Sequence, residues 1–218
     1  MFKDPNTILV IVDMQNYYIN PDSDYCRYFD ELYDNSLEYL HMRCKGIVLP
    51  NIRRLINLFR NNSKKILFLK LCSHKEDRSD LHNFFHDINK KAAKEGYNNL
   101  YPLCTDLMAD ITDELNPSEN DLIITKTTYS PFSSTEIDTI LHSEQITTLV
   151  FSGLSTSQCV ETTARDASDR GYNVIHIEDA QADYDEITHI YSLISSRGVC
   201  GGVIYTTEEY IELVNRED

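Results

Sequence analysis

Three residues whose side chains can together perform nucleophilic catalysis each come at or shortly after the end of an apolar run. They are Asp13, Lys126 and Cys159. A thiol can attack a carbonyl carbon, a carboxylate can accept the thiol proton, and an ammonium can stabilise the thiolate. Each residue alone also has an ordinary structural explanation, as a turn former, a solvated lysine or a packed thiol. Their joint position at the ends of apolar runs predicts acyl transfer if the three side chains meet.

Cys159 is distinguished from the other five cysteines by its position. It follows Gly153 by a short loop and begins a segment with helical spacing. The unpaired N–H groups and positive dipole end of a helix start favour a thiolate, so we expect a pKa below the usual value of about 8.5. We expect ordinary packed side chains and no disulfides for the others, because the chain shows no secretory signal. These are Cys26, Cys44, Cys72, Cys104 and Cys200.

The elements that would position these residues are short apolar runs separated by amphipathic segments. The runs are almost continuously apolar, which is typical of parallel strands covered on both faces. Helical spacing recurs between them, and in residues 185–198 it places Ile187, Ile190, Tyr191 and Ile194 on one face. The predicted strands are residues 7–12, 65–71, 121–125, 146–152, 173–177 and 201–205.

This alternation predicts an α/β fold. We expect a single domain over residues 1–218, with a doubly wound, mostly parallel six-stranded sheet and helices on both faces. Ligands of such sheets bind beyond the carboxyl ends of the strands, where the three reactive residues fall. Residues 16–47 and 73–104 are longer than a crossover needs. They either form the pocket rim or a subunit contact, or are solvated surface segments.

Composition limits the partners. The 218 residues carry a formal charge of −15, which disfavours nucleic acid or an anionic membrane as a partner. No apolar run approaches the roughly 18 residues of a membrane span, so we expect a cytoplasmic protein.

Three stretches resemble the isochorismatase-like cysteine hydrolase family: "VIVDMQNYY", "TKTTYSPFSSTEIDTIL" and "TTLVFSGLSTSQCVETTARDASDRGYNVIHIEDA". The likeness extends from about residue 7 to 205 and is densest between 121 and 180. It implies a catalytic triad of Asp13, Lys126 and Cys159. It also implies a non-proline cis peptide at Leu154–Ser155, with the backbone N–H groups of Ser155 and Cys159 donating to the oxyanion. Tyr129 would face the pocket, and homo-oligomers would be expected.

The family divides by chemistry, and a cysteine at the nucleophile position favours hydrolysis of a small amide or ureide through a thioester. Metal-dependent nicotinamidase-like members are similar in fold, but the metal-site spacing they carry is absent from "LCSHKEDRSDLH". We therefore expect neither a metal nor another cofactor. The histidines and aspartates of that stretch are explained by a solvated loop or by capping.

Polar side chains from the loops would orient such a substrate. The candidates are Asn16, Tyr17, Ser73 and Gln181, in addition to Tyr129. Two alternatives stay open: a nicotinamidase-like amidase with an altered metal site, and a non-catalytic binding or assembly module on the same fold.

Overall fold

A computed structural model describes residues 4–33, 37–198 and 202–216 of the chain. Within these residues, six parallel strands form one sheet in the order β3-β2-β1-β4-β5-β6. The predicted α/β fold is confirmed, with boundary shifts of one or two residues at β3 and β4 and a longer β5. The strands are β1 (Thr7–Val12), β2 (Lys65–Leu71), β3 (Leu122–Lys126), β4 (Thr148–Leu154), β5 (Asn173–Ala182) and β6 (Val203–Tyr205). Gly201, at the start of the predicted last strand, lies outside the described residues.

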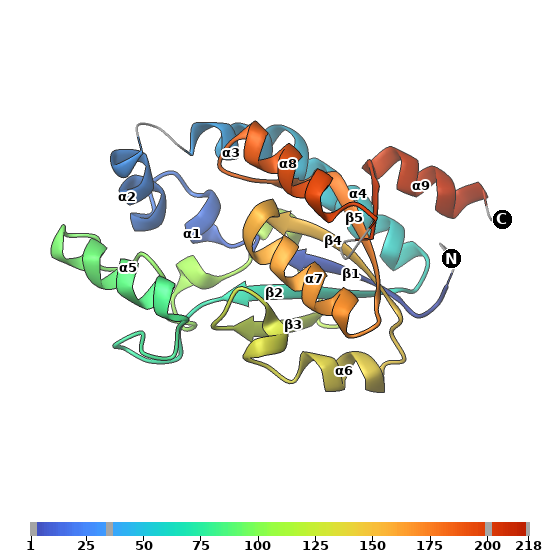
Figure 1. Cartoon of the computed structure of the whole chain (residues 1–218), viewed down its shortest axis with the longest axis horizontal. Helices are drawn as coiled ribbons and strands as arrows, with labels where there is room; N and C mark the ends of the chain where they lie inside the picture. The colour runs from blue at the N-terminus through green and yellow to red at the C-terminus, as the bar shows by residue number, and fades with distance from the viewer. Residues whose placement is uncertain (1–3, 34–36, 199–201, 217–218) are drawn as a thin grey trace.

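Helices cover both faces of the sheet (Figure 1). The two faces are the main layers of the core, and alternate side chains of one strand point into different layers. Leu9 and Ile11 of β1 pack with α4 and α9, whereas Ile8 and Val10 pack with α6 and α7. The α-helices are α1 (Asn16–Ile19), α2 (Asp24–Leu32), α3 (Glu38–Arg43), α4 (Leu49–Asn61), α5 (Asn83–Lys94), α6 (Ile137–Ser143), α7 (Glu161–Asp169), α8 (Glu186–Ser196) and α9 (Thr207–Arg216).

Short helical turns complete the described elements. π-helical turns lead directly into α4 and α7, and 3-10 turns occur in the loops around β3. They are Cys44–Val48, Thr156–Val160, Leu107–Ala109, Asp113–Leu115 and Pro131–Ser133. In the described part of the chain, we find no helix with the length and apolar character to cross a membrane.

Helix α8 is oriented with its polar face inward. Its serines lie against α7, where Ser192 and Ser196 donate hydrogen bonds to Glu161. The four apolar residues that share a helix face point to solvent instead. Ile187, Ile190, Tyr191 and Ile194 are 68%, 44%, 67% and 59% exposed. The helix is therefore held against α7 and the turn after β4 mainly by polar contacts, with Leu193 also buried, and it leaves these four apolar side chains uncovered.

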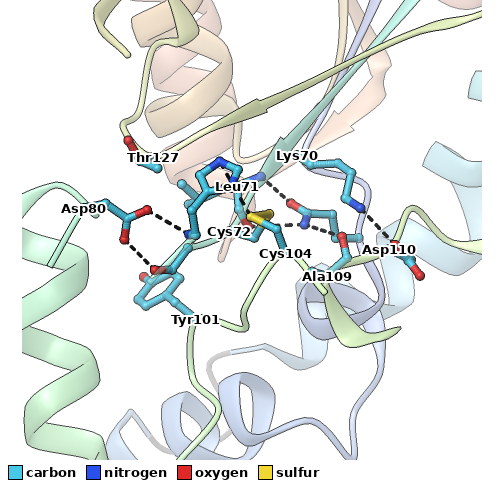
Figure 2. The surroundings of a disulfide bond; sticks show 12 residues. Lys70, Leu71, Cys72, Asp80, Tyr101, Cys104, Ala109, Asp110 and Thr127 are labelled. Atoms are coloured by element: carbon cyan, nitrogen blue, oxygen red, sulfur yellow. Dashed lines mark hydrogen bonds and ion pairs between the residues drawn. A yellow bond between two sulfur atoms is a disulfide. The ribbon is translucent and has the colours of Figure 1, made fainter. Parts of the chain in front are cut away.

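The expectation that the chain has no disulfide is wrong, because Cys72 and Cys104 are paired (Figure 2). Cys72 follows the last residue of β2, and Cys104 follows Leu103, which forms a parallel bridge with Ser73. This bridge brings the two Cα atoms to 5.1 Å, within the range that a disulfide requires. Residues 32 positions apart therefore meet through a loop that sequence spacing did not predict.

The cis peptide implied at Leu154–Ser155 is also wrong, since the described residues contain no cis peptide bond. The chain changes direction there by other means. Gly153 has a positive φ of 101°, and the π-helical turn Thr156–Val160 follows Ser155.

Candidate active site

The side chains of Asp13, Lys126 and Cys159 meet at the carboxyl edge of the sheet, and we call them the reacting cluster. The Lys126 Nζ atom lies 2.8 Å from Asp13 Oδ2 and 3.2 Å from Cys159 Sγ. It also donates to the Thr128 carbonyl oxygen at 3.2 Å. All three side chains are buried. The three N–H bonds of the ammonium therefore have three acceptors, and the lysine is held in one position.

The strand order explains why residues so distant in sequence meet. Asp13 directly follows β1, Lys126 ends β3, and Cys159 lies in the turn after β4, which pairs with β1. Asp13 has a positive φ of 50°, an uncommon conformation for a residue other than glycine. Its backbone is fixed by its N–H, which donates to Leu69, and by its carbonyl, which accepts from Gln15.

Gly153 permits the close approach of β4 to β1 beside the cluster. A Cβ atom built on this residue would lie 2.1 Å from the Val12 carbonyl oxygen, far inside any contact distance. Glycine also accommodates the positive φ at this position without strain. The backbone contact between Gly153 and Val12 thus sets the distance between Asp13 and the turn that carries Cys159.

Burial dominates the electrostatics of the cluster. It raises the pKa of the Asp13 carboxyl, which Lys126 lowers only in part. Burial and then the Asp13 carboxylate raise the pKa of the Cys159 thiol well above its ordinary value, against the opposing effect of Lys126. Burial lowers the pKa of Lys126, but Asp13 and Cys159 reverse that effect and raise it. The expectation of a lowered thiol pKa is therefore wrong, because the thiol is enclosed beside a carboxylate.

The turn that carries Cys159 is held from β5 and α8. The buried Asp183 carboxylate accepts a hydrogen bond from the Ser157 N–H at 2.6 Å. The Thr156 hydroxyl lies 2.8 Å from Nδ1 of His189 and donates to the Ala182 carbonyl oxygen. These contacts hold the turn that carries Cys159 against the end of β5 and against α8.

A cavity of about 390 Å³ adjoins this turn through Gln158. Burial raises the pKa of both Tyr101 and Tyr184, two of the rings that line the cavity. Residues 16–47 contribute Phe29 and Tyr33 to the lining, and residues 73–104 contribute Phe84 and Tyr101, which is one of the alternatives that the sequence left open for these segments. The aromatic residues that line the cavity form what we call the aromatic wall: Phe29, Tyr33, Phe84, Tyr101 and Tyr184.

Tyr17 lies in the hydrophobic core and Tyr129 packs against it, and neither is among the residues that line the cavity. Burial and then Cys159 raise the pKa of Tyr129 to about 12, and its ring packs 4.5 Å from the Phe85 ring, centroid to centroid. Tyr17 is buried, and its hydroxyl donates to the Leu71 carbonyl oxygen. A role of either residue in substrate binding stays a prediction, and the Tyr17 hydroxyl already has a partner.

The other three candidates have polar groups engaged elsewhere in the framework. The Asn16 amide donates to the Leu107 carbonyl oxygen, and the Ser73 hydroxyl lies within hydrogen-bond distance of the Lys75 carbonyl oxygen and the Asp80 carboxylate in the loop after β2. The Gln181 amide is buried in β5 and donates to the Phe151 carbonyl oxygen. The structure therefore does not bring these three side chains together in the cavity.

The loop after β2 uses its polar residues for local hydrogen bonds. Asp80 accepts from the backbone N–H of His74, and the ring of His82 accepts from the Phe84 N–H at the start of α5. Among residues 4–33, 37–198 and 202–216, no three His, Cys, Asp or Glu side chains are grouped to hold a metal ion.

Sequence reasoning missed Asp183, His189 and the aromatic wall. Asp183 comes one residue after the end of β5. An acidic residue just beyond a predicted strand was a signal that could have been followed. The contact of His189 with Thr156 depends on the orientation of α8 and had no signal in the sequence.

Comparisons with known proteins agree with this architecture. An isochorismatase domain model matches residues 7–209. The ureidoacrylate amidohydrolase RutB of Serratia proteamaculans is 30% identical over 185 residues, covering 82% of this chain and 71% of that protein. A cysteine hydrolase from Pseudomonas syringae pv. phaseolicola aligns with a TM-score of 0.77 at 24% identity, over 99% of this chain and 95% of that one. The N-carbamoylsarcosine amidase from Thermoplasma acidophilum aligns with a TM-score of 0.64 at 25% identity, over 93% and 96%.

Proposed function

The chain belongs to the isochorismatase family of hydrolases, and from this premise we propose that it is a cysteine amidohydrolase that cleaves the C–N bond of a small amide or ureide. The observation that supports this most directly is the contact of the Lys126 Nζ atom with both Asp13 Oδ2 and Cys159 Sγ. Carboxylate, ammonium and thiol are the groups that acyl transfer through a thioester needs.

In the first half of the reaction, Asp13 accepts the Cys159 proton and the sulfur attacks the substrate carbonyl carbon. The base is necessary because burial and Asp13 raise the pKa of the thiol. Lys126 stays protonated and stabilises the sulfur anion. The backbone N–H groups of Ser155 and Cys159 donate to the developing oxyanion, a role that fits acyl transfer.

In the second half, the C–N bond breaks and the proton held by Asp13 passes to the leaving amine or ammonia. Lys126 is a poor proton donor for this step, because its three N–H bonds are directed at Asp13, Cys159 and the Thr128 carbonyl. Water then attacks the thioester with Asp13 as base. The acid product leaves, and the proton returns to the sulfur.

The aromatic wall favours an uncharged substrate. The residues that line the cavity are Phe29, Tyr33, Phe84, Tyr101, Gln158 and Tyr184, and none of these six has a cationic side chain. A carboxylate would lose its hydration there without gaining a cation, which is costly. We therefore infer that the substrate is a neutral amide or ureide with an apolar or aromatic group, in contrast to the ureidoacrylate in the name of the Serratia relative.

A panel of small amides with ammonia detection tests the proposal. It pairs neutral compounds such as benzamide, phenylacetamide and phenylurea with carboxylate analogues such as N-carbamoylglycine. Cys159→Ala should abolish turnover while Cys44→Ala, at another buried cysteine, keeps it. Mass spectrometry of the wild-type protein mixed with substrate should show an acyl adduct on Cys159.

The outcomes separate the proposal from its alternatives. Unchanged turnover in Cys159→Ala would exclude the mechanism. Turnover of nicotinamide that depends on an added divalent metal would indicate the nicotinamidase-like alternative. Absence of both turnover and adduct across the panel would favour a non-catalytic module.

We also propose that the enzyme works as a homo-oligomer on its small-molecule substrate in the cytoplasm, without nucleic-acid or membrane partners. The charge of −15 supports the last point. Cell fractionation tests the location. The result is informative because Cys72 and Cys104 are paired, whereas disulfides are rare in cytosolic proteins.

A further inference from the structure

Helix α8 displays a row of apolar side chains to solvent, and we call Ile187, Ile190, Tyr191 and Ile194 the outer stripe. All four are exposed, and the helix that carries them is well within the described part of the chain. Scattered exposed apolar residues are ordinary on protein surfaces, but a continuous row of large ones marks a contact surface.

The inner face of α8 shows that the helix cannot turn to bury this stripe. Ser192 and Ser196 donate to the Glu161 carboxylate on α7, and Arg165 pairs with the same carboxylate. His189 contacts both Arg43 Nη2 at 2.9 Å and the Thr156 hydroxyl. Rotation of α8 would leave these buried polar groups without partners, at a cost for each group. The outward direction of the stripe is therefore built into the fold.

A groove of about 470 Å³ runs beside the stripe and adds to the surface. It is lined by Tyr39 and Arg43 on one side and by Ile190 and Ile194 of α8 on the other. Met42 and Ile47, on the neighbouring segment, are also exposed. Figure 1 shows α3 and α8 at the same edge of the molecule. Specific interfaces bury roughly 800 Å² on each partner, so the stripe and these neighbours are needed together.

We propose that this surface is the contact between two copies of this chain, with the two α8 helices antiparallel across a two-fold axis. The stripe is self-complementary under that symmetry. An axis between Ile190 and Tyr191 places Ile187 opposite the partner's Ile194, and Ile190 opposite the partner's Tyr191. Each apolar side chain then meets another apolar one, as an isologous interface requires.

The charges at the ends of α8 fit the same arrangement. Glu186 begins the helix and Arg197 follows its last residue, and both side chains are exposed. Along the helix, the point midway between Glu186 and Arg197 lies within about one residue, or roughly 1.5 Å, of the proposed axis. An antiparallel pair therefore brings Glu186 close to the partner's Arg197 at each end. A parallel pair would instead place like charges together.

Light scattering coupled to size exclusion tests the interface. The wild-type protein should have at least twice the 25.2 kDa mass of the chain. Ile190→Glu should lower the mass at least twofold while the circular dichroism spectrum is kept, because the site is exposed and the fold does not depend on it. Ile123→Glu, on the exposed part of distant β3, is the matched control and should leave the mass unchanged. A monomeric wild type, or an Ile190→Glu protein of unchanged mass, would overturn the proposal.

A charge exchange tests the antiparallel arrangement independently of folding. Arg197→Glu should raise the dissociation constant of the dimer by at least about tenfold, because it places two carboxylates together at each end. Adding Glu186→Arg restores opposite charges and should recover most of that loss, as measured by sedimentation equilibrium at low salt. If the double variant dissociates as readily as Arg197→Glu, the antiparallel pairing is refuted.

Discussion

The reacting cluster is buried, whereas the aromatic wall lines a cavity that adjoins the turn of Cys159 through Gln158, and the two sets of side chains are held in different ways. Asp13, Lys126 and Cys159 stand at the ends of strands or in the turn after one, their side chains are buried, and their charges are matched by contacts of 2.8–3.2 Å. The wall comes from helices and loops outside the sheet. Its members range from buried Tyr101 to Tyr33, which is mostly exposed.

This difference indicates which part of the site each kind of change affects. Each charge in the cluster is buried beside its partner. The loss of one group therefore leaves a buried charge unpaired, which lowers the free energy of unfolding and also impairs the reaction. A ring in the wall packs against other rings, and the loss of one leaves the others in place. We therefore expect reaction chemistry to depend on the cluster and substrate preference to depend on the wall.

The largest effect is expected from Lys126→Met, which leaves the Asp13 carboxylate buried without its cation. The free energy of unfolding at pH 8 should fall by roughly 3–5 kcal/mol, as measured by urea denaturation. Turnover should fall at least about 10²-fold. Lys65→Met is the control, because the Lys65–Glu144 pair is exposed and should contribute about 1 kcal/mol or less. Equal losses of unfolding free energy in the two variants would contradict the proposed difference between the buried cluster and an exposed ion pair.

Removal of Asp13, the proposed base, is the next test of the cluster. Asp13→Asn should lower kcat/KM roughly 10²- to 10⁴-fold. Asp13 accepts a proton only when ionised, so activity rises as pH increases through its pKa. Burial raises that pKa, and the acid limb of the wild-type profile should lie above the ordinary aspartate value of about 3.9. A limb at or below pH 3.9, or one that persists in Asp13→Asn, would assign it to another group.

Asp183 tests whether the cluster depends on the turn that carries the thiol. Asp183→Ala removes the acceptor for the Ser157 N–H, and kcat should fall roughly 10- to 100-fold with little change in KM. Asp183→Asn keeps an acceptor oxygen and should recover most of the activity. Asp185→Ala, which removes the cap of α8, should cost about 1 kcal/mol of stability and leave kcat unchanged. A purely structural role would lower stability in Asp183→Ala without this selective loss of kcat.

The smallest effect is expected in the wall. Phe84 is 49% exposed, and Phe84→Ala should raise KM for an aromatic amide about three- to tenfold, with acetamide affected less than about twofold. Leu107→Ala is the control, because Leu107 is 78% exposed and does not line the cavity. An equal rise in KM for both amides would show that the wall does not select the substrate.

The parts of the molecule that the sequence predicted well are those governed by strand burial. Continuous apolar runs indicated parallel strands, and their ends located Asp13, Lys126 and Cys159 at one edge of the sheet. The aromatic wall could not be predicted residue by residue, because it depends on how two long segments fold over that edge. Asn16, Ser73 and Gln181 were chosen by residue type, yet each has a hydrogen-bond partner in the framework.

Other features depend on contacts that no local pattern encodes. Amphipathic spacing located α8 but could not tell which face is covered, because serines that satisfy Glu161 outweigh the apolar side chains there. The disulfide requires the bridge between Ser73 and Leu103. The thiol pKa was misjudged because burial beside a carboxylate exceeds the effect of a helix start.

Gly153 has a consequence for any attempt to evolve or redesign this enzyme. Even an added methyl group would collide with the Val12 carbonyl and force two central strands apart. Cys159 and its proposed base Asp13 follow those two strands, so the collision would separate them although no atom of the site had been altered. A random-mutation screen should therefore tolerate glycine alone at this position, even among variants selected for entirely new substrates.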